Sequence, residues 1–270
     1  MKIITSIFDL NKEIKDYNNI GFVPTMGGIH DGHKSLIKAS QKKKTKTIVS
    51  IFVNPTQFNK KDDFKNYPRN IKKDIAVLKK LNVEYLFTPK TKDIYKLKGK
   101  KFNLKKKDKI LCAKVRNGHF EGVLNIMNRL MTIIKSKDLY MGEKDYQQLF
   151  LIKKYLSKKF NVRINSCPTI RIKNNIALST RNNLLKKKSL KNASQIALFL
   201  KKIKYESKLD DPKLSFKLTN YKNKLEKKYN IKIDYLEFRD EKNLKLNNFK
   251  NKCRLFVAYN IDDVRLIDNY

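Results

Sequence analysis

Short apolar runs alternate with segments of helical periodicity over the first 170 residues of this 270-residue chain, and this alternation restricts its fold most. The runs expected to form strands are 20–23, 47–53, 83–87, 138–141 and 162–166. The segments expected to form helices are 35–43, 71–78, 123–134 and 146–156. Strands that alternate with helices in this way favour a parallel sheet with helices on both faces. We therefore expect an α/β domain built on a doubly wound, Rossmann-like parallel sheet.

The pattern changes near Thr169. Beyond it, helices are expected at 190–207 and 215–229 and alternating strands at 231–238 and 254–259. That order is typical of a small α+β domain with a short antiparallel sheet. We expect two domains, residues 1–169 and 170–270, which pack closely because no Gly/Ser-rich linker separates them.

The chain is strongly basic, with 63 Lys and Arg against 25 Asp and Glu and a formal charge of +38. Clustered cations bind nucleic acid by releasing counterions from its phosphates. Here the lysines are spread from Lys2 to Lys252, without a zinc-finger, helix-turn-helix or RNA-binding motif. We favour the interpretation that lysine fills solvated positions, and we expect no specific nucleic-acid partner. A basic nucleic-acid-binding protein without catalysis is the alternative from another class.

The sequence also bears on the location of the protein. It has no apolar run of about 18 residues, so we expect no membrane span. Asp9 and Glu13 interrupt the first apolar stretch, and we expect no signal peptide. Cys112, Cys167 and Cys253 lie far apart with no C-x-x-C pair, which favours free thiols over a disulfide or a zinc site. We therefore expect a cytoplasmic protein.

Glycine and histidine are scarce in this chain, and they cluster. There are eight glycines and three histidines. Six of the glycines and all three histidines fall within Gly27–His33, Gly118–Gly122 and Gly142. A chain that otherwise avoids both residue types uses them where backbone freedom and imidazole chemistry are needed together.

The first of these clusters follows an expected strand and opens an expected helix. It reads P-T-M-G-G-I-H-D-G-H from Pro24 to His33. Its glycines let the backbone approach phosphates, and a helix start offers unpaired N–H groups at the positive end of a dipole. His30 and His33 can reach the same side of the turn and donate to phosphate oxygens. The H-x-G-H string resembles the signature of nucleotidyltransferases related to the class I aminoacyl-tRNA synthetases, which act at the α-phosphate of ATP.

Further motifs follow in a fixed order. They are S-I-F-V-N-P-T-Q-F at 50–58, Y-P-R at 67–69, R-N-G-H-F at 116–120, M-G-E-K-D-Y-Q-Q at 141–148, L-S-T-R-N at 178–182 and R-L-I-D-N at 265–269. Together with P-T-M-G-x-x-H-x-G-H, this set resembles the pantothenate synthetase family. The resemblance is dense over residues 21–182 and thin over 183–253.

The resemblance implies which residues bind the nucleotide. The ATP-binding residues would be Met26, Gly27, Gly28, Ile29, His30, Asp31, Gly32, His33, Gly142, Glu143, Lys144, Asp145, Ile170, Leu178, Ser179, Thr180 and Arg181. Among them, His33, His30, Lys144 and Arg181 would be catalytic. Asp145 would contact the ribose and Ile170 the adenine.

The resemblance also implies the other substrates and the reaction. Gln57 and Gln148 would hold pantoate, with Asn54 beside Gln57 and β-alanine placed with the help of Gln57. An amide side chain suits hydroxyls and a carboxylate because it both donates and accepts. ATP would be a substrate, with Mg²⁺ near Asp74. The family joins pantoate to β-alanine through a pantoyl adenylate and releases AMP and pyrophosphate. A homodimer is implied as well, with residues 170–270 as a lid on the catalytic domain.

Several alternatives and departures accompany this interpretation. Another H-x-G-H nucleotidyltransferase, which keeps the nucleotide on its product, is the rival enzyme, although the two glutamines and the G-E-K-D segment argue against it. Glu143 and Asp145 could instead cap a helix, and Gln57 could serve turn chemistry after Asn-Pro. Cys112 stands where the family usually has an acidic residue, and Asn117 where it usually has proline.

Overall fold

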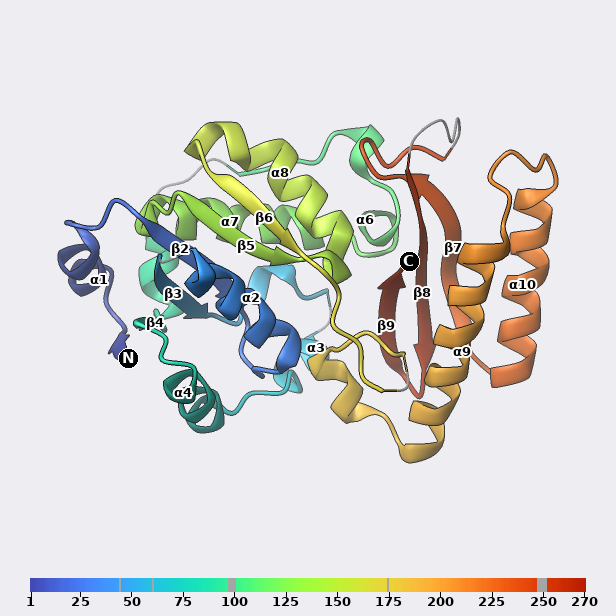
Figure 1. Ribbon diagram of the computed structural model, residues 1–270, viewed down its shortest axis with the longest axis horizontal. Helices are drawn as coiled ribbons and strands as arrows, with labels where there is room; N and C mark the ends of the chain where they lie inside the picture. The colour runs from blue at the N-terminus through green and yellow to red at the C-terminus, as the bar shows by residue number, and fades with distance from the viewer. Residues whose placement is uncertain (44, 60, 97–100, 174, 247–251) are drawn as a thin grey trace. The chain divides into compact units, whose positions relative to one another are not determined.

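The computed structural model describes residues 1–43, 45–59, 61–96, 101–173, 175–246 and 252–270. The chain divides into two compact units, Met1–Thr169 and Ile170–Tyr270 (Figure 1). None of the helices in the described ranges has the length and apolar character that crossing a membrane requires.

The first unit contains one sheet and its covering helices. Its strands are β1 (Lys2–Ile4), β2 (Ile20–Thr25), β3 (Lys46–Ile51), β4 (Tyr85–Phe87), β5 (Asp138–Gly142) and β6 (Arg163–Cys167). Its longer helices are α1 (Ile7–Ile14), α2 (Asp31–Lys42), α4 (Ile71–Lys80), α7 (His119–Ile134) and α8 (Tyr146–Phe160). Shorter turns are α3 (Lys61–Lys65), α5 (Thr91–Lys96), α6 (Cys112–Val115), η1 (Pro55–Gln57), η2 (Lys106–Asp108) and η3 (Glu143–Asp145).

The sheet is parallel throughout and has the strand order β1-β4-β3-β2-β5-β6. From β2 the chain winds through β3 to β4 toward one edge, and from β5 to β6 toward the other. The direction of winding therefore reverses between β2 and β5. The predicted doubly wound sheet is confirmed.

Helices cover both faces of this sheet. On one face α2 and α4 pack in a cluster that includes Val23, Leu36, Val49, Leu78 and Leu86. Right-handed crossovers that lead toward opposite edges place their helices on opposite faces. The helix α8, between β5 and β6, therefore covers the other face (Figure 1).

The sequence analysis missed β1, α1 and the short helical turns of this unit, and it misplaced one helix start. The strand β1 was not expected because three residues are too few to show alternation. The helix α2 begins at Asp31 rather than near residue 35. His30 caps it, and histidine is not among the usual N-cap residues.

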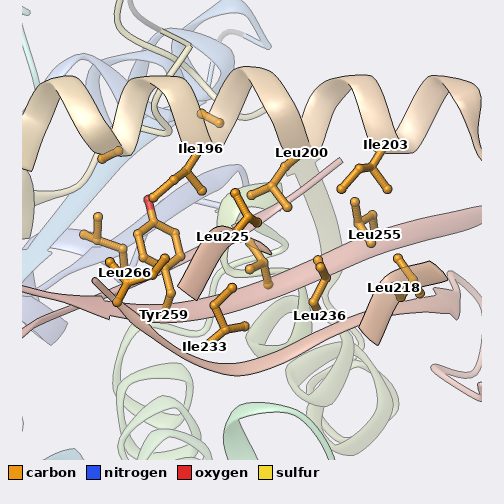
Figure 2. Close-up of a cluster of buried hydrophobic side chains, with 14 of the residues drawn as sticks. Ile196, Leu200, Ile203, Leu218, Leu225, Ile233, Leu236, Leu255, Tyr259 and Leu266 are labelled. Carbon is orange, nitrogen blue, oxygen red and sulfur yellow. The ribbon is translucent and has the colours of Figure 1, made fainter. Parts of the chain in front are cut away.

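The second unit is a small α+β arrangement. It contains η4 (Thr180–Leu184), α9 (Lys187–Glu206), α10 (Leu214–Tyr229), β7 (Lys232–Asp240), β8 (Cys253–Ile261) and β9 (Val264–Asn269). The three strands form an antiparallel sheet in the order β7-β8-β9. In Figure 2, Ile196, Leu200 and Ile203 project from their helix toward the side chains of the sheet, where the apolar core of this unit lies.

The strand β9 was not predicted as a strand. It follows β8 after a two-residue turn in which Asp262 and Asp263 have φ angles of 48° and 60°. Such left-handed pairs make tight hairpins, and aspartate tolerates them less readily than the Asn-Gly pair that usually signals them. The predicted small α+β domain is confirmed.

A buried carboxylate joins β5 to β6 in the first unit. Asp138 is 1% exposed and accepts two hydrogen bonds from Arg163, at 2.7 and 2.8 Å, and one from Asn165 at 2.7 Å. The hydrogen bonds from Arg163 lower the pKa of Asp138 to about 2, against an ordinary value of 3.8. The carboxylate therefore contributes stability in its ionised form.

We expect Asp138→Asn to lower the free energy of unfolding at pH 7 by about 1–3 kcal/mol, the scale for hydrogen bonds to charged groups. The folded pKa is depressed, so this stability is present above pH 3.8 and is lost as the pH falls toward 2. Urea unfolding of the parent and of Asp138→Asn should show a difference in unfolding free energy that narrows below pH 3.8. Asp16→Asn, at an exposed position, is the control, and a difference independent of pH would contradict the assignment.

Candidate active site

Three loops of the first unit follow adjacent strands at the carboxyl edge of the sheet. The turn Met26–His33 follows β2, the turn Asn54–Gln57 follows β3, and Gly142–Asp145 ends β5. The strands β2 and β5 flank the reversal of winding. The loop after β2 leads to a helix on one face of the sheet, and the loop after β5 leads to a helix on the other. In open α/β sheets, ligands bind in the crevice at this switch point. The sheet thus gathers most of the residues that the sequence singled out.

The turn after β2 requires its glycines. Gly27 and Gly28 have φ angles of 82° and 65°, a left-handed conformation that favours glycine. A Cβ on Gly27 would lie 2.9 Å from Oδ2 of Asp74 and 3.2 Å from Cγ2 of Ile51. The turn therefore has no room for a side chain at this position.

Two histidines form the start of α2. His30 accepts a hydrogen bond at Nδ1 from the Gly32 N–H at 3.1 Å, and Nδ1 of His33 accepts from the His30 N–H at 3.4 Å. Their rings stack with centroids 4.1 Å apart and an interplanar angle of 28°. Because each Nδ1 accepts, each neutral ring carries its proton on Nε2.

Both histidines are held neutral. Burial lowers the pKa of His30, and burial lowers the pKa of His33 to about 3. Lys144, from the loop after β5, lowers both pKa values further, while Asp145 opposes it. These electrostatic effects show that the loops after β2 and β5 lie close together. At neutral pH the site therefore offers neutral N–H donors beside a lysine.

The turn after β3 is built around Asn54. Its buried side chain accepts from the Tyr95 hydroxyl at 2.5 Å and donates to the Gly122 carbonyl of α7 at 3.2 Å. It also caps η1 by accepting from the Thr56 N–H. Asn54 also donates to Oε1 of Gln57 at 3.3 Å, and Nε2 of Gln57 contacts the sulfur of Met26.

Arg116 and His119 hold the backbone of Gln57. Nδ1 of His119 lies 2.7 Å from the Gln57 carbonyl oxygen, and its Nε2 lies 2.9 Å from Nη1 of Arg116. Arginine can only donate, so Nε2 accepts and Nδ1–H donates to the carbonyl. A Cβ on Gly122 would lie 2.4 Å from the Thr56 carbonyl oxygen, so α7 packs directly on this turn. Neither Arg116 nor His119 was predicted as a site residue, although the clustering of scarce glycine and histidine marked their segment.

Adjacent glutamines on α8 differ in their surroundings. Gln147 is buried; its side chain accepts from the Cys112 N–H at 3.0 Å and donates to the Ile110 carbonyl at 2.7 Å. Gln148 is half-buried, and within the described part of the chain its amide makes no hydrogen bond. Cys112 itself is buried, and its backbone N–H is the group that contacts Gln147.

The segment before α8 does not cap that helix with a carboxylate. Asp145 occupies the N-cap position, but its side chain makes no capping hydrogen bond. Its Oδ1 lies 3.3 Å from Nζ of Lys144. The capping interpretation of Asp145 is therefore wrong, and the carboxylate is oriented by lysine.

The remaining predicted nucleotide residues lie in the second unit. The Leu178 N–H donates to the Ile170 carbonyl at 3.0 Å and closes a loop. Ser179 caps η4 by accepting from the Arg181 N–H, and Asn182 accepts from the Ser179 N–H. The Ser179 hydroxyl thus fixes the backbone that carries Thr180 and Arg181.

Asp74 was predicted to lie near Mg²⁺. Its two carboxylate oxygens accept from the Gly28 N–H at 2.9 Å and the Ile29 N–H at 2.8 Å. Among the described residues, no three His, Cys, Asp or Glu side chains are grouped so as to hold a metal ion. Both carboxylate oxygens of Asp74 are thus engaged by backbone N–H groups of the turn after β2.

Comparison with known proteins gives a consistent picture. The family model described as pantoate-beta-alanine ligase matches residues 2–270. A pantothenate synthetase of Francisella tularensis subsp. novicida is 39% identical over 99% of this chain and 95% of that protein.

Solved structures agree with these matches. A crystal structure of pantoate-beta-alanine ligase from Francisella tularensis, complexed with beta-gamma ATP and beta-alanine, is 38% identical with a TM-score of 0.84. The match covers 100% of this chain and 97% of that one. The pantothenate synthetase of Thermus thermophilus is 28% identical with a TM-score of 0.90, over 100% of this chain and 99% of that one.

We expect two different histidine tautomers in solution. Nitrogen-15 NMR of the imidazoles should show His30 and His33 as Nε2–H and His119 as Nδ1–H, and the chain has no other histidine to confuse the spectrum. His33 should stay neutral between pH 8 and 5, since its pKa is about 3. Arg116→Met should reduce the Nδ1–H population of His119. Titration of His33 near its ordinary value of 6.5 would refute this geometry.

Proposed function

The chain belongs to the pantoate–β-alanine ligase family, and we propose that it joins pantoate to β-alanine through a pantoyl adenylate formed from ATP. It is a ligase that forms an amide bond. The observation that carries the proposed mechanism is the meeting of two loops at the switch point. The stacked histidines of the loop after β2 lie near Lys144 of the loop after β5, and Met26 of the first loop contacts Gln57, which follows β3.

The first step transfers the adenylyl group. A carboxylate oxygen of pantoate attacks the α-phosphorus of ATP, the bond from that phosphorus to the bridging oxygen breaks, and pyrophosphate leaves with the electron pair. Two anions must approach, so positive charge and N–H donors at the phosphates lower the barrier. Lys144 and Arg181 supply the charge and His30 an Nε2–H donor. His33, which hydrogen-bonds to the Gly28 backbone, can exchange that bond for one to a phosphate oxygen.

The second step forms the amide. The unprotonated amine of β-alanine attacks the acyl carbon, the bond from that carbon to the AMP oxygen breaks, and the new amide nitrogen loses a proton. Gln57 and Gln148 hold the pantoyl hydroxyls and carbonyl, with Asn54 fixing the turn that bears Gln57. Because the activated acyl group stays in the pocket, proximity supplies much of the rate.

The remaining nucleotide contacts are part of the same proposal. Met26–His33 and Gly142–Asp145 would surround the phosphates and the ribose, with Asp145 on the ribose. Ile170 and Leu178–Arg181 would be further nucleotide contacts. Mg²⁺ would arrive on the phosphates of ATP, since this ion keeps water and phosphate ligands more readily than it enters a protein cage.

The setting of the enzyme also remains a proposal. We propose a homodimer in the cytoplasm, without a specific nucleic-acid partner. The spread of lysine over the whole chain supports the last point, because scattered surface charge is screened at physiological salt.

If a pantoyl adenylate is the intermediate, it should form before β-alanine reacts. With ATP and pantoate but no β-alanine, the enzyme should exchange labelled pyrophosphate into ATP, because the first step is complete and reversible without the amine. Lys144→Ala should lower this exchange by roughly a hundredfold, the scale for losing one donor to developing charge.

The exposed Lys153 on α8 provides the matched control, and Lys153→Ala should exchange normally. Folded protein that shows no exchange would eliminate the adenylate mechanism. Salt-resistant, sequence-selective binding to nucleic acid without ATP turnover would favour the non-enzymatic alternative instead.

Substitutions of the two neighbouring glutamines of α8 should have different effects, one on substrate binding and the other on stability. Gln148→Ala should raise the pantoate KM about threefold to tenfold, since it removes a hydrogen bond worth about 0.5–1.5 kcal/mol. Its ATP KM and its unfolding free energy should stay nearly unchanged. Gln147→Ala should instead cost about 1–3 kcal/mol of stability, because the Cys112 N–H and the Ile110 carbonyl lose their partner.

Steady-state kinetics and urea unfolding of the two variants provide the measurements. If Gln148→Ala raised the KM for ATP as much as the KM for pantoate, the assignment of Gln148 to pantoate would be wrong.

A further inference from the structure

We propose that Asp74 is a positioning residue that holds the Gly27–Ile29 turn in its phosphate-binding shape, and that it is not a ligand of Mg²⁺. This inference deepens the proposed function, on which its catalytic part rests. Asp74 lies in the first turn of α4, 46 residues from Gly28 in the chain. Its contact is therefore a tertiary one, made between two separate crossovers of the sheet.

Both oxygens of the carboxylate are engaged by the turn. Oδ2 lies 2.9 Å from the Gly28 nitrogen, and Oδ1 lies 2.8 Å from the Ile29 nitrogen. Asp74 is only 4% exposed. Two consecutive N–H groups that point at one carboxylate form the kind of concave backbone site that binds anions. Here the protein supplies that anion itself.

Asp74 also lies where its own helix suits an acidic side chain. The helix begins after Asn70, whose side chain accepts from the Lys73 N–H. Acidic side chains in a first helical turn interact favourably with the positive end of the helix dipole. Two backbone donors of the turn therefore hold a carboxylate that lies at the start of α4.

This arrangement constrains the backbone that leads to the two histidines. Gly27 and Gly28 have positive φ angles, and glycine has many other conformations available when it is not held. The carboxylate selects one of them, and Ile29 leads directly to His30 at the cap of α2. Loss of the carboxylate should therefore loosen the turn and displace the histidines from the phosphates.

A second consequence concerns the nucleotide. Because the Gly28 and Ile29 N–H groups already donate to Asp74, they do not donate to ATP phosphates. Phosphate binding in this loop then falls to the imidazole N–H groups of His30 and His33, because the Gly32 N–H at the start of α2 also donates within the protein. Gly28 and Ile29 would then maintain the conformation of the turn and would not bind phosphate through their N–H groups.

The variant Asp74→Asn tests the proposal, because an amide offers one acceptor oxygen where two N–H donors need two. In the protein without substrates, hydrogen exchange of the Gly28 or Ile29 amide should become at least tenfold faster, with amides of β6 unchanged. This readout is independent of the reaction, so it stands even if the proposed function fails. Unchanged exchange at both amides would overturn the proposal.

Activity measurements distinguish positioning from metal binding. In Asp74→Asn the ATP KM should rise about tenfold, while the Mg²⁺ concentration for half-maximal rate, at saturating ATP, stays within twofold of the parent. A tenfold rise in that Mg²⁺ requirement, with a normal ATP KM at high Mg²⁺, would identify a metal ligand and overturn the proposal. Asp16→Asn, which removes an exposed carboxylate, is the matched control.

The parent protein gives a test that does not depend on the folding of a variant. Titration with Mg²⁺ alone, without nucleotide, should leave the amide NMR signals of Gly28 and Ile29 in place. Saturable shifts of both signals would show that the ion competes for the Asp74 carboxylate, which would contradict the proposal.

Discussion

The reversal of winding between β2 and β5 is the constraint on which the active site depends. Since β2 leads into α2 on one face and β5 leads into α8 on the other, both loops leave the sheet at the switch point, which is where ligands bind in open α/β sheets. Each loop delivers one kind of chemistry to that point. The loop after β2 brings imidazole N–H donors, and the loop after β5 brings Lys144. A single topological feature thus explains why residues far apart in the chain act together.

The charge state of the histidines at this switch point contrasts with the strongly basic net charge of the chain. The protein carries a formal charge of +38, yet burial holds its two adjacent histidines neutral. Two neutral imidazoles can both contact phosphate, whereas two stacked imidazolium cations would repel each other. The lysine beside them supplies charge at one point, and a buried aspartate shapes the turn.

Much of the fold could be predicted from the sequence, because strand and helix periodicity are local signals. The runs at β2, β3 and β5 and the stripe along α7 were recognised for that reason. The strand β1 and the strand β9 were missed, since one is too short to alternate and the other follows an Asp-Asp turn that rarely signals a hairpin. The α2 start was misplaced because a histidine side chain performs the capping.

The candidate site was predicted less completely, because its supporting contacts are long-range. Scarce glycine and histidine drew attention to three segments, but no spacing shows that His119 binds the Gln57 carbonyl, 62 residues away. The contact of Asp74 with Gly28 and Ile29 is equally invisible in the sequence, where the family resemblance alone implied a place for Asp74 near Mg²⁺.

The central claim is that one active site activates pantoate and then transfers it to β-alanine. The most direct test is to quantify AMP, pyrophosphate and pantothenate in the same reaction, with each substrate omitted in turn. The account predicts equal amounts of all three products, formed in multiple turnovers only when ATP, pantoate and β-alanine are all present. Sustained AMP production without pantothenate, or a product that retains the nucleotide, would contradict it.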